Sequence, residues 1–121
     1  MKSPTESQSQ QAVFEWAEWN INCYPDLEWM YAIPNGGLRH KAVAAKLKAE
    51  GVKSGVSDIH LPVPKGRYIG LWIELKVGKN KPTEKQLRFQ EQMREYGHYA
   101  CVCYGAAEAI AKLEWYLTDR S

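Results

Sequence analysis

Hydrophobic residues recur along this 121-residue chain with two different periods. A period near 3.6 residues predicts helices over residues 5–21, 39–50, 83–96 and 106–117. Apolar runs rich in β-branched and aromatic residues predict strands over residues 28–33, 56–63, 68–77 and 98–104. The predicted order is α β α β β α β α, which favours a mixed α/β domain with helices packed on a central sheet.

Threonine residues are predicted to cap two of these helices. Thr83 is followed at the capping-box position by Gln86, an arrangement that satisfies two backbone N–H groups at the start of a helix. Thr5 is a predicted N-cap as well, although Glu6 does not stand at the capping-box spacing from it. Pro64–Arg67 suits a hairpin connection, so the predicted strands on either side of it are expected to pair.

The composition bounds the class of protein. A mass of 13.8 kDa, 45% hydrophobic residues and five tryptophans are typical of one folded domain, expected here over residues 1–121. No apolar run approaches the roughly 18 residues that a membrane helix needs, and the polar start lacks the apolar region of a signal peptide. Three cysteines without metal-ligand spacing argue against a disulfide scaffold or a zinc site. We therefore expect a cytoplasmic protein without a membrane partner.

The charge is unevenly distributed. Residues 39–88 carry twelve of the sixteen Lys and Arg residues against four acidic ones, a net charge of +8 in a chain whose total is +2. Such a segment suits a face that binds a polyanion, although a solvated lysine-rich surface explains the same count. The turn around Asn35 either offers backbone N–H groups to a phosphate or serves as a plain turn. The candidate nucleic-acid contacts are Asn35, Arg39, Lys41, Lys53, Lys79 and Lys81.

One combination of residues carries recognisable chemistry, namely Asp58 followed by Glu74-Leu75-Lys76. On a strand, Glu74 and Lys76 point to one face and Leu75 to the other. A hairpin centred on Gly66 places Asp58 directly across from Glu74, with Cβ atoms about 4.5–5.5 Å apart. Two carboxylates so close repel each other unless a cation lies between them, and Mg²⁺ or Mn²⁺ is the expected occupant. Prolines in the first strand leave open a register shifted by one residue.

This combination indicates a reaction. A metal ion held by two carboxylates activates water and offsets charge on a phosphoryl oxygen. Lys76 beside the ion would orient or deprotonate the attacking water, or offset the charge of the pentavalent phosphate. The basic segment would hold a phosphodiester backbone with sequence-independent, salt-sensitive affinity. These residues indicate a metal-dependent phosphodiesterase, with a solvated cross-strand cluster of charges as the alternative interpretation.

Asp58 and Glu74-Leu75-Lys76 also resemble the signature of the PD-(D/E)xK nuclease superfamily. Over nearly its whole length the chain is similar to the VRR-NUC (virus-type replication-repair nuclease) domains, especially the stand-alone domains of bacteriophages. The chain departs from that family at Ser57, where proline is usual, which affects the stiffness of the backbone before Asp58 and not a ligand. The matching positions are Glu6, Gln10, Ile33–Gly37, Leu47–Val52, Gly55–Asp58, Ile73–Lys76, Thr83, Gln86 and Gly97.

The resemblance implies a restriction-endonuclease-like mixed β-sheet flanked by helices, with a metal site. Asp58 and Glu74 are implied to be metal ligands, with the main-chain carbonyl of Leu75 as a third. Glu6 corresponds to a carboxylate on the first helix of the family, which completes the metal site or holds its waters. Metal binding is therefore expected to involve Asp58, Glu74, Leu75 and Glu6.

The resemblance also implies an activity. Lys76 becomes the expected catalytic lysine, and Gln86 is expected to support the site or the scissile phosphate. The protein is expected to be a homodimeric, Mg²⁺- or Mn²⁺-dependent DNA endonuclease acting on branched DNA such as Holliday junctions, in DNA repair, within a bacterial or phage-infected host cell. A dimer suits a symmetric junction because isologous pairing supplies two matched sites. A DNA-binding module that keeps the fold without turnover, and a phosphoesterase of small nucleotides, are the alternatives.

Other residues are open to two interpretations. His60 would share the face of Asp58 and either assists the site or is a surface or hydrogen-bonded residue. The aromatic segment around Trp29 serves either the core or a dimer contact. Four tryptophans stand at periodic positions typical of a core, namely Trp16, Trp19, Trp72 and Trp115.

Overall fold

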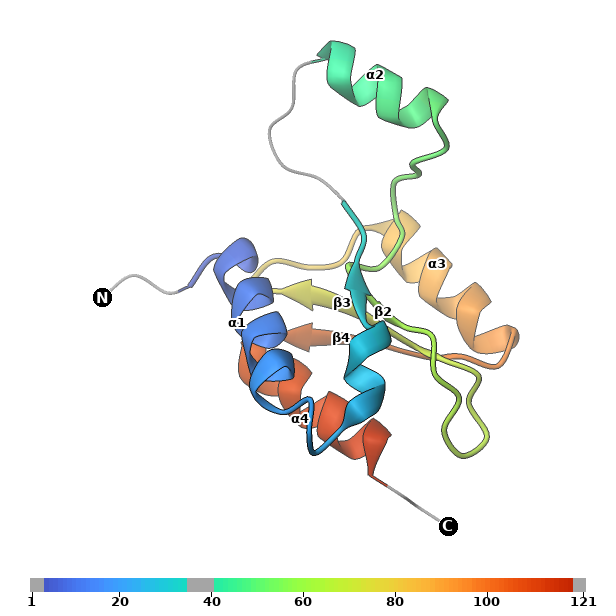
Figure 1. The fold of residues 1–121 in the computed structure, drawn as a ribbon. Helices are drawn as coiled ribbons and strands as arrows, with labels where there is room; N and C mark the ends of the chain where they lie inside the picture. Colours follow the sequence, from blue (N-terminus) through green and yellow to red (C-terminus); the bar gives the residue numbers. More distant parts are fainter. Residues whose placement is uncertain (1–3, 35–40, 119–121) are drawn as a thin grey trace.

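The computed structural model describes residues 4–34 and 41–118, and its elements follow the predicted order (Figure 1). The helices are α1 (Glu6–Trp19), α2 (Lys41–Ala49), α3 (Glu84–Glu95) and α4 (Gly105–Leu117). The strands are β1 (Tyr31–Ala32), β2 (Ile59–Leu61), β3 (Leu71–Lys76) and β4 (Tyr99–Tyr104), and a short 3₁₀ helix, η1, spans Pro25–Trp29. None of the helices in these two ranges is long and apolar enough to cross a membrane.

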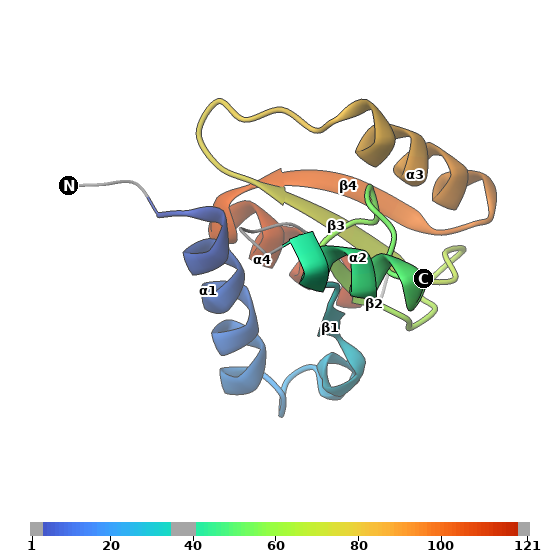
Figure 2. The same ribbon diagram turned by 90° about the horizontal axis from the view of Figure 1, so that it is seen from above.

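The described strands form one mixed sheet in the order β1-β2-β3-β4. β1 is antiparallel to β2 and β2 to β3, whereas β3 and β4 are parallel. α1 and α4 pack against each other on one face of the sheet, and α3 packs on the other face beside β4 (Figures 1 and 2). The structure confirms the predicted mixed sheet flanked by helices.

β3 lies at the centre of the core because both of its faces are buried. Leu71, Ile73 and Leu75 belong to the main hydrophobic cluster, together with Val13 of α1 and Leu113 of α4. Successive side chains of a strand point to opposite faces. The intervening residues of β3 therefore face α3, and the polar side chains of the strand lie on that side.

Both predicted threonine caps are present, and each belongs to a capping box. At α3, the Thr83 hydroxyl accepts from the Gln86 N–H at 3.2 Å, while Gln86 Oε1 accepts from the Thr83 N–H at 2.8 Å. At α1, the Thr5 hydroxyl accepts from the Gln8 N–H at 3.1 Å, and Gln8 Oε1 accepts from the Thr5 N–H at 2.9 Å. Gln8, three positions after Thr5, therefore completes a box that the spacing of Glu6 did not indicate.

The predicted strand over residues 28–33 is mostly wrong. Pro25 stands at the start of η1, and only Tyr31 and Ala32 pair with β2. Proline favours the first turn of a helix because its φ already suits a helix and the first N–H groups need no partner there. This local preference overrides the alternation of apolar residues, and Trp29 is exposed at the surface.

Two of the tryptophans expected in the core lie at the surface. Trp19 is 81% exposed, because it lies about 240° around α1 from the buried Val13. Trp115 is 37% exposed, and its ring packs beside that of Tyr99. The second strand is also shorter than predicted and stops before Pro62, which has no N–H to continue a ladder.

The packing of α4 on the sheet can be tested at Leu113, whose side chain is fully buried. Leu113→Ala should lower the free energy of unfolding by about 2–5 kcal/mol, because it removes buried methyl groups and leaves a cavity. Leu87→Ala is the matched control, since Leu87 is 51% exposed on α3, and a change within about 0.5 kcal/mol is expected there. Urea unfolding followed by circular dichroism measures both, and equal losses would contradict the packing described.

Candidate active site

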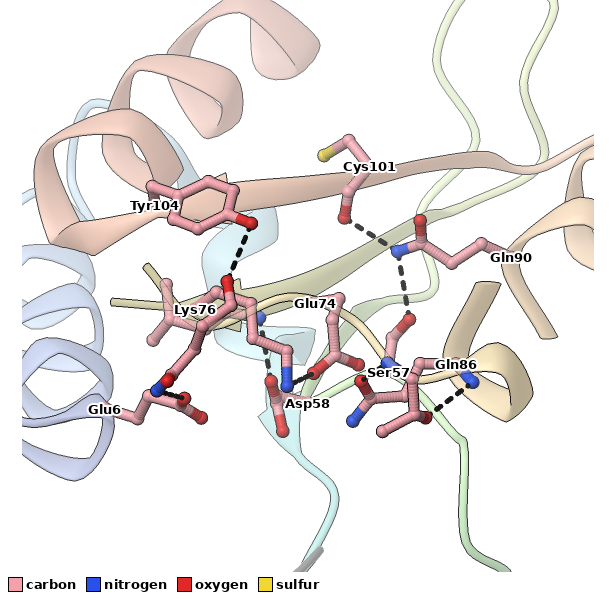
Figure 3. Close-up of polar contacts among 12 residues, drawn as sticks. Glu6, Ser57, Asp58, Glu74, Lys76, Gln86, Gln90, Cys101 and Tyr104 are labelled. Atoms are coloured by element: carbon pink, nitrogen blue, oxygen red, sulfur yellow. Dashed lines mark hydrogen bonds and ion pairs between the residues drawn. The ribbon is translucent and has the colours of Figure 1, made fainter. Parts of the chain in front are cut away.

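The pairing of β2 with β3 has the register predicted from a hairpin centred on Gly66. Ile59 pairs with Ile73, so Asp58 and Glu74 are the next residues along the two strands. The register shifted by one residue is not found. The two acidic side chains therefore meet where β2 begins, and Figure 3 shows them directed toward each other.

The Asp58 side chain continues the ladder just before β2 begins. Its Oδ2 accepts a hydrogen bond from the Leu75 N–H at 2.7 Å, and its main-chain carbonyl accepts one from the Ile33 N–H at 2.8 Å. The N–H and C=O groups of one strand residue point to the same edge. The Leu75 carbonyl is therefore on the side of Asp58, which is where a main-chain metal ligand would have to lie.

Glu74 is a buried carboxyl group with little to stabilise its charge. Its side chain is 1% exposed, and Oε1 has no hydrogen-bond partner within the described residues. Burial, and next the charge of Asp58, raise the pKa of Glu74 to about 8, while Lys76 acts in the opposite direction. A buried carboxylate normally has a donor or a cation beside it, so the Glu74 carboxyl group is a candidate ligand for a cation.

Among the described residues, Lys76 is the positive charge paired with this carboxylate. Its side chain is largely buried, and Nζ lies 3.6 Å from Glu74 Oε2. Glu74 and Lys76 thus project from the same face of β3, as predicted from their spacing. Because a buried ammonium group is costly without a partner, Lys76 is held at the acidic pair and is directed into the site.

These groups open onto a cleft of about 590 Å³ between α1, the 54–58 segment and the start of α3. The cleft brings together side chains that are far apart in the sequence, and Figure 3 shows Glu6 on one side of the acidic pair and Gln86 on the other. Its lining includes Glu6, Asp58, Glu74, Lys76, Lys85 and Gln86. All the polar side chains predicted for catalysis thus line one cavity.

Glu6 is held by a residue that the sequence analysis did not single out. Its Oε2 accepts a hydrogen bond from Asn80 Nδ2 at 3.2 Å. The main-chain carbonyl of Asn80 in turn accepts from the Tyr104 hydroxyl at 2.8 Å. The loop after β3 is therefore tied both to the first turn of α1 and to the end of β4.

One end of the Gln86 side chain is already hydrogen-bonded at the start of α3. Its Oε1 accepts from the Thr83 N–H in the capping box, so this oxygen is already engaged. The amide nitrogen of Gln86 is then the group that remains for a ligand in the cleft. As a donor, it suits a phosphate oxygen or a water molecule better than a cation.

The donor set fits a hard divalent ion that keeps part of its water shell. Carboxylate and carbonyl oxygens are the ligands that Mg²⁺ and Mn²⁺ prefer, and Mg²⁺ usually keeps several waters. Within residues 4–34 and 41–118, no three His, Cys, Asp or Glu side chains converge into a ready metal cage. Asp58 and Glu74 therefore form the close pair, while Glu6 stands across the cleft at a position suited to holding waters.

The lysines predicted to contact nucleic acid surround this cleft unevenly. Lys79 and Lys81 are exposed on the loop that holds Asn80, next to Glu6. Lys41 and Lys53 are exposed at and beyond the two ends of α2, which stands away from the sheet in Figure 1. The predicted contacts Asn35 and Arg39 lie outside the described residues.

His60 has a packing role. Its ring stacks on that of Trp72 with centroids 3.7 Å apart, and its Nδ1 lies 2.6 Å from the Tyr31 hydroxyl. Burial, and next the charge of His98, lower the pKa of His60 to about 4. The half-buried ring is thus a hydrogen-bonded part of an aromatic layer between the sheet and α3.

A buried polar contact behind the acidic pair was not predicted from the sequence. Gln90 and Ser57 are both fully buried and hydrogen-bonded to each other. The only feature of the sequence that pointed to Gln90 was its position four residues after Gln86. That spacing places it on the side of α3 that faces the sheet. Without knowledge of what covers that face, an exposed glutamine was the default expectation.

Comparisons with known proteins agree with this description. A sequence profile of the VRR-NUC domain matches residues 5–107. A solved structure described as a VRR_NUC domain protein is similar with a TM-score of 0.81 and 29% sequence identity, over 98% of this chain and 94% of that chain. A search of curated proteins finds no significant match. The profile match includes Asp58, Glu74 and Lys76.

The buried acid can be tested through the pH dependence of stability. The pKa of Glu74 is raised from about 4.5 to about 8 by folding, so the folded state holds this proton more tightly than the unfolded chain. This contribution to stability is fully present below pH 4.5 and is lost as the pH rises through 8. Glu74→Gln, which is always neutral, should therefore raise the Tm of the metal-free protein by several degrees at high pH and by much less at low pH.

Thermal unfolding in a chelator at pH 5 and at pH 8.5 measures this difference. Glu84→Gln is the control, because Glu84 is an exposed residue of the same cleft rim, and its Tm should follow that of the unmodified protein at both values. A stabilisation by Glu74→Gln that is the same at both pH values would contradict the raised pKa.

Proposed function

The chain belongs to the VRR-NUC domain family, a family of nuclease domains, and we propose that this protein is a Mg²⁺- or Mn²⁺-dependent DNA endonuclease. The observation that supports the proposal most strongly is the acidic pair. Glu74 is buried against Asp58, and one of its oxygens has no hydrogen-bond partner in the described part of the chain, an arrangement that a bound cation would relieve. The bound ion would supply activation of water and neutralisation of charge on the phosphoryl group.

Each side chain of the cleft has a separate role in the proposed reaction. Asp58 and Glu74, with the Leu75 carbonyl, would hold the ion. Lys76 would orient the attacking water or stabilise charge on the phosphate, since its ammonium group is fixed beside Glu74. The amide nitrogen of Gln86 would donate to a phosphate oxygen, because its carbonyl oxygen is used by Thr83. Glu6 would hold a water molecule from across the cleft.

Exposed lysines supply the affinity for the DNA backbone. Lys79 and Lys81 stand on the loop next to the cleft, where a phosphate entering the site would pass. Affinity of this kind is independent of sequence and falls steeply as salt rises. Selection of branched DNA then depends on the geometry of two sites, which leads to the proposal that the enzyme is a homodimer.

α2 supports that proposal because no other described element packs closely against it. None of its residues is buried, and Val43 is 48% exposed. A helix of nine residues is marginal in water without tertiary packing. Val43 and Leu47 form an apolar ridge on one side of α2, with spacing i, i+4, and a second copy of the chain is the partner we propose for it.

The catalytic role of Lys76 is tested by Lys76→Met, which keeps the side-chain volume. Cleavage of DNA in Mg²⁺ or Mn²⁺ should fall by about 10²–10³-fold, because a fixed positive charge at the reacting group is lost. DNA affinity measured in Ca²⁺ should change by less than about threefold. Lys65→Met is the matched control and should leave cleavage unchanged, since Lys65 lies on the hairpin and pairs with Asp26 of η1.

The substrates in that experiment distinguish the alternatives. Matched four-way, flap, splayed-arm and linear DNAs show whether branched structures are preferred. Binding without any cleavage in either metal would favour a DNA-binding module over an enzyme. Hydrolysis of small nucleotides with little dependence on salt would favour a phosphoesterase.

The dimer is tested through the mass in solution. Light scattering should give about twice the 13.8 kDa of one chain. Val43→Glu should halve that mass, because it places a charge in the apolar ridge of α2. Ala45→Glu adds the same charge about 160° around the helix and should leave the mass unchanged. A monomeric unmodified protein would reject the dimer and leave the catalytic proposal standing.

A further inference from the structure

The fully buried pair Gln90 and Ser57 lies directly behind the acidic site. Gln90 Nε2 donates to the Ser57 hydroxyl at 3.2 Å and to the main-chain carbonyl of Cys101 at 2.7 Å (Figure 3). Both side chains have no exposed surface. A buried amide is retained only when its hydrogen bonds are made, so these contacts determine where the two residues lie.

The orientation of the Gln90 amide follows from its partners. A main-chain carbonyl can only accept, so the nitrogen of the amide must face Cys101. On the other side, Gln90 Oε1 lies 3.4 Å from Arg94 Nη2. Arg94 is itself anchored, because its Nε and Nη2 donate to the Ala100 carbonyl at 3.1 and 2.8 Å. β4 and α3 thus hold Gln90 in one position.

The segment that Gln90 reaches runs along α3 before β2 begins. Residues 54–57 precede β2, which starts at Ile59, and the Ser54 hydroxyl accepts a hydrogen bond from Lys85 Nζ at 3.3 Å. Gly55 packs against Lys85 of α3 so closely that an added Cβ would lie 3.1 Å from the Lys85 carbonyl oxygen, and its φ is +92°. The segment therefore lies against α3 at Gly55 and is attached to it at Ser57.

The residue next to this attachment is Asp58. It follows Ser57 directly, and its carboxylate must meet the Leu75 N–H at 2.7 Å while leaving its other oxygen for the cleft. A shift of the backbone at Ser57 would move that carboxylate away from Glu74. We propose that Gln90 is a positioning residue that fixes Asp58, through Ser57, at the distance from Glu74 that metal binding needs; the part concerning metal rests on the proposed function.

Two variants separate this role from stability alone. Gln90→Leu leaves the Ser57 hydroxyl buried without its donor, and a lower Tm is expected for that reason. The double variant Ser57→Ala/Gln90→Leu removes both polar partners, so its Tm should recover toward that of the unmodified protein. Gln92→Leu is the matched control, because Gln92 is an exposed glutamine on the same helix.

The first readout needs no metal. Hydrogen exchange of the Leu75 amide, followed by NMR relative to the Ile73 amide of the same strand, reports whether Asp58 still accepts from Leu75. We expect Leu75 to exchange about tenfold faster in both Gln90 variants, with no change in Gln92→Leu. The second readout is calorimetric titration with Mn²⁺, where both Gln90 variants should bind about 10–100-fold more weakly.

The outcomes are distinguishable. If the double variant recovers its Tm and also shows normal Leu75 protection and Mn²⁺ affinity, Gln90 has only a structural role and the inference is overturned. Faster exchange of Leu75 in both variants, in a protein that never binds Mn²⁺, would support the positioning of Asp58 and reject the proposed metal chemistry. Normal exchange of Leu75 in both variants overturns the inference whatever the metal does.

Discussion

The close approach of two carboxyl groups inside the sheet is the constraint on which the rest of the structure depends. Glu74 stands on the central strand, is buried on its own face and lies beside Asp58. Such a pair is destabilising in the metal-free protein, and Lys76 at 3.6 Å offsets it only in part. The fold holds this arrangement because the opposite face of the same strand is entirely apolar and well packed.

The two faces of β3 therefore have different structural roles. The face toward α1 and α4 supplies hydrophobic stabilisation through Ile73 and its neighbours, and it contains the main apolar cluster. The face toward α3 carries Trp72, Glu74 and Lys76, and the His60 ring of β2 stacks on Trp72 there. A rigid strand that is anchored on one side can present strained polar groups on the other, as active sites require.

Polar contacts between distant segments support each side of the acidic pair. On one side, Asn80 links the loop after β3 to Glu6, and Tyr104 holds that loop to β4. On the other side, Gln90 links α3 and β4 to the residue before Asp58. The loop at Asn80 also carries the exposed Lys79 and Lys81. The same loop therefore supports both the surface proposed to meet DNA and the site proposed to cut it.

The amino-acid sequence by itself determined the order of the elements, the pairing of the hairpin and the common face of Glu74 and Lys76. These features depend on local periods and on the symmetry of a turn about Gly66, which neighbouring residues specify. Tertiary structure decided the rest: η1 in place of most of a strand, the exposure of Trp19, and the contacts of Gln90 with Ser57 and Asn80 with Glu6. Contacts between residues 33 and 74 positions apart depend on how helices dock on the sheet, and no local pattern encodes that docking.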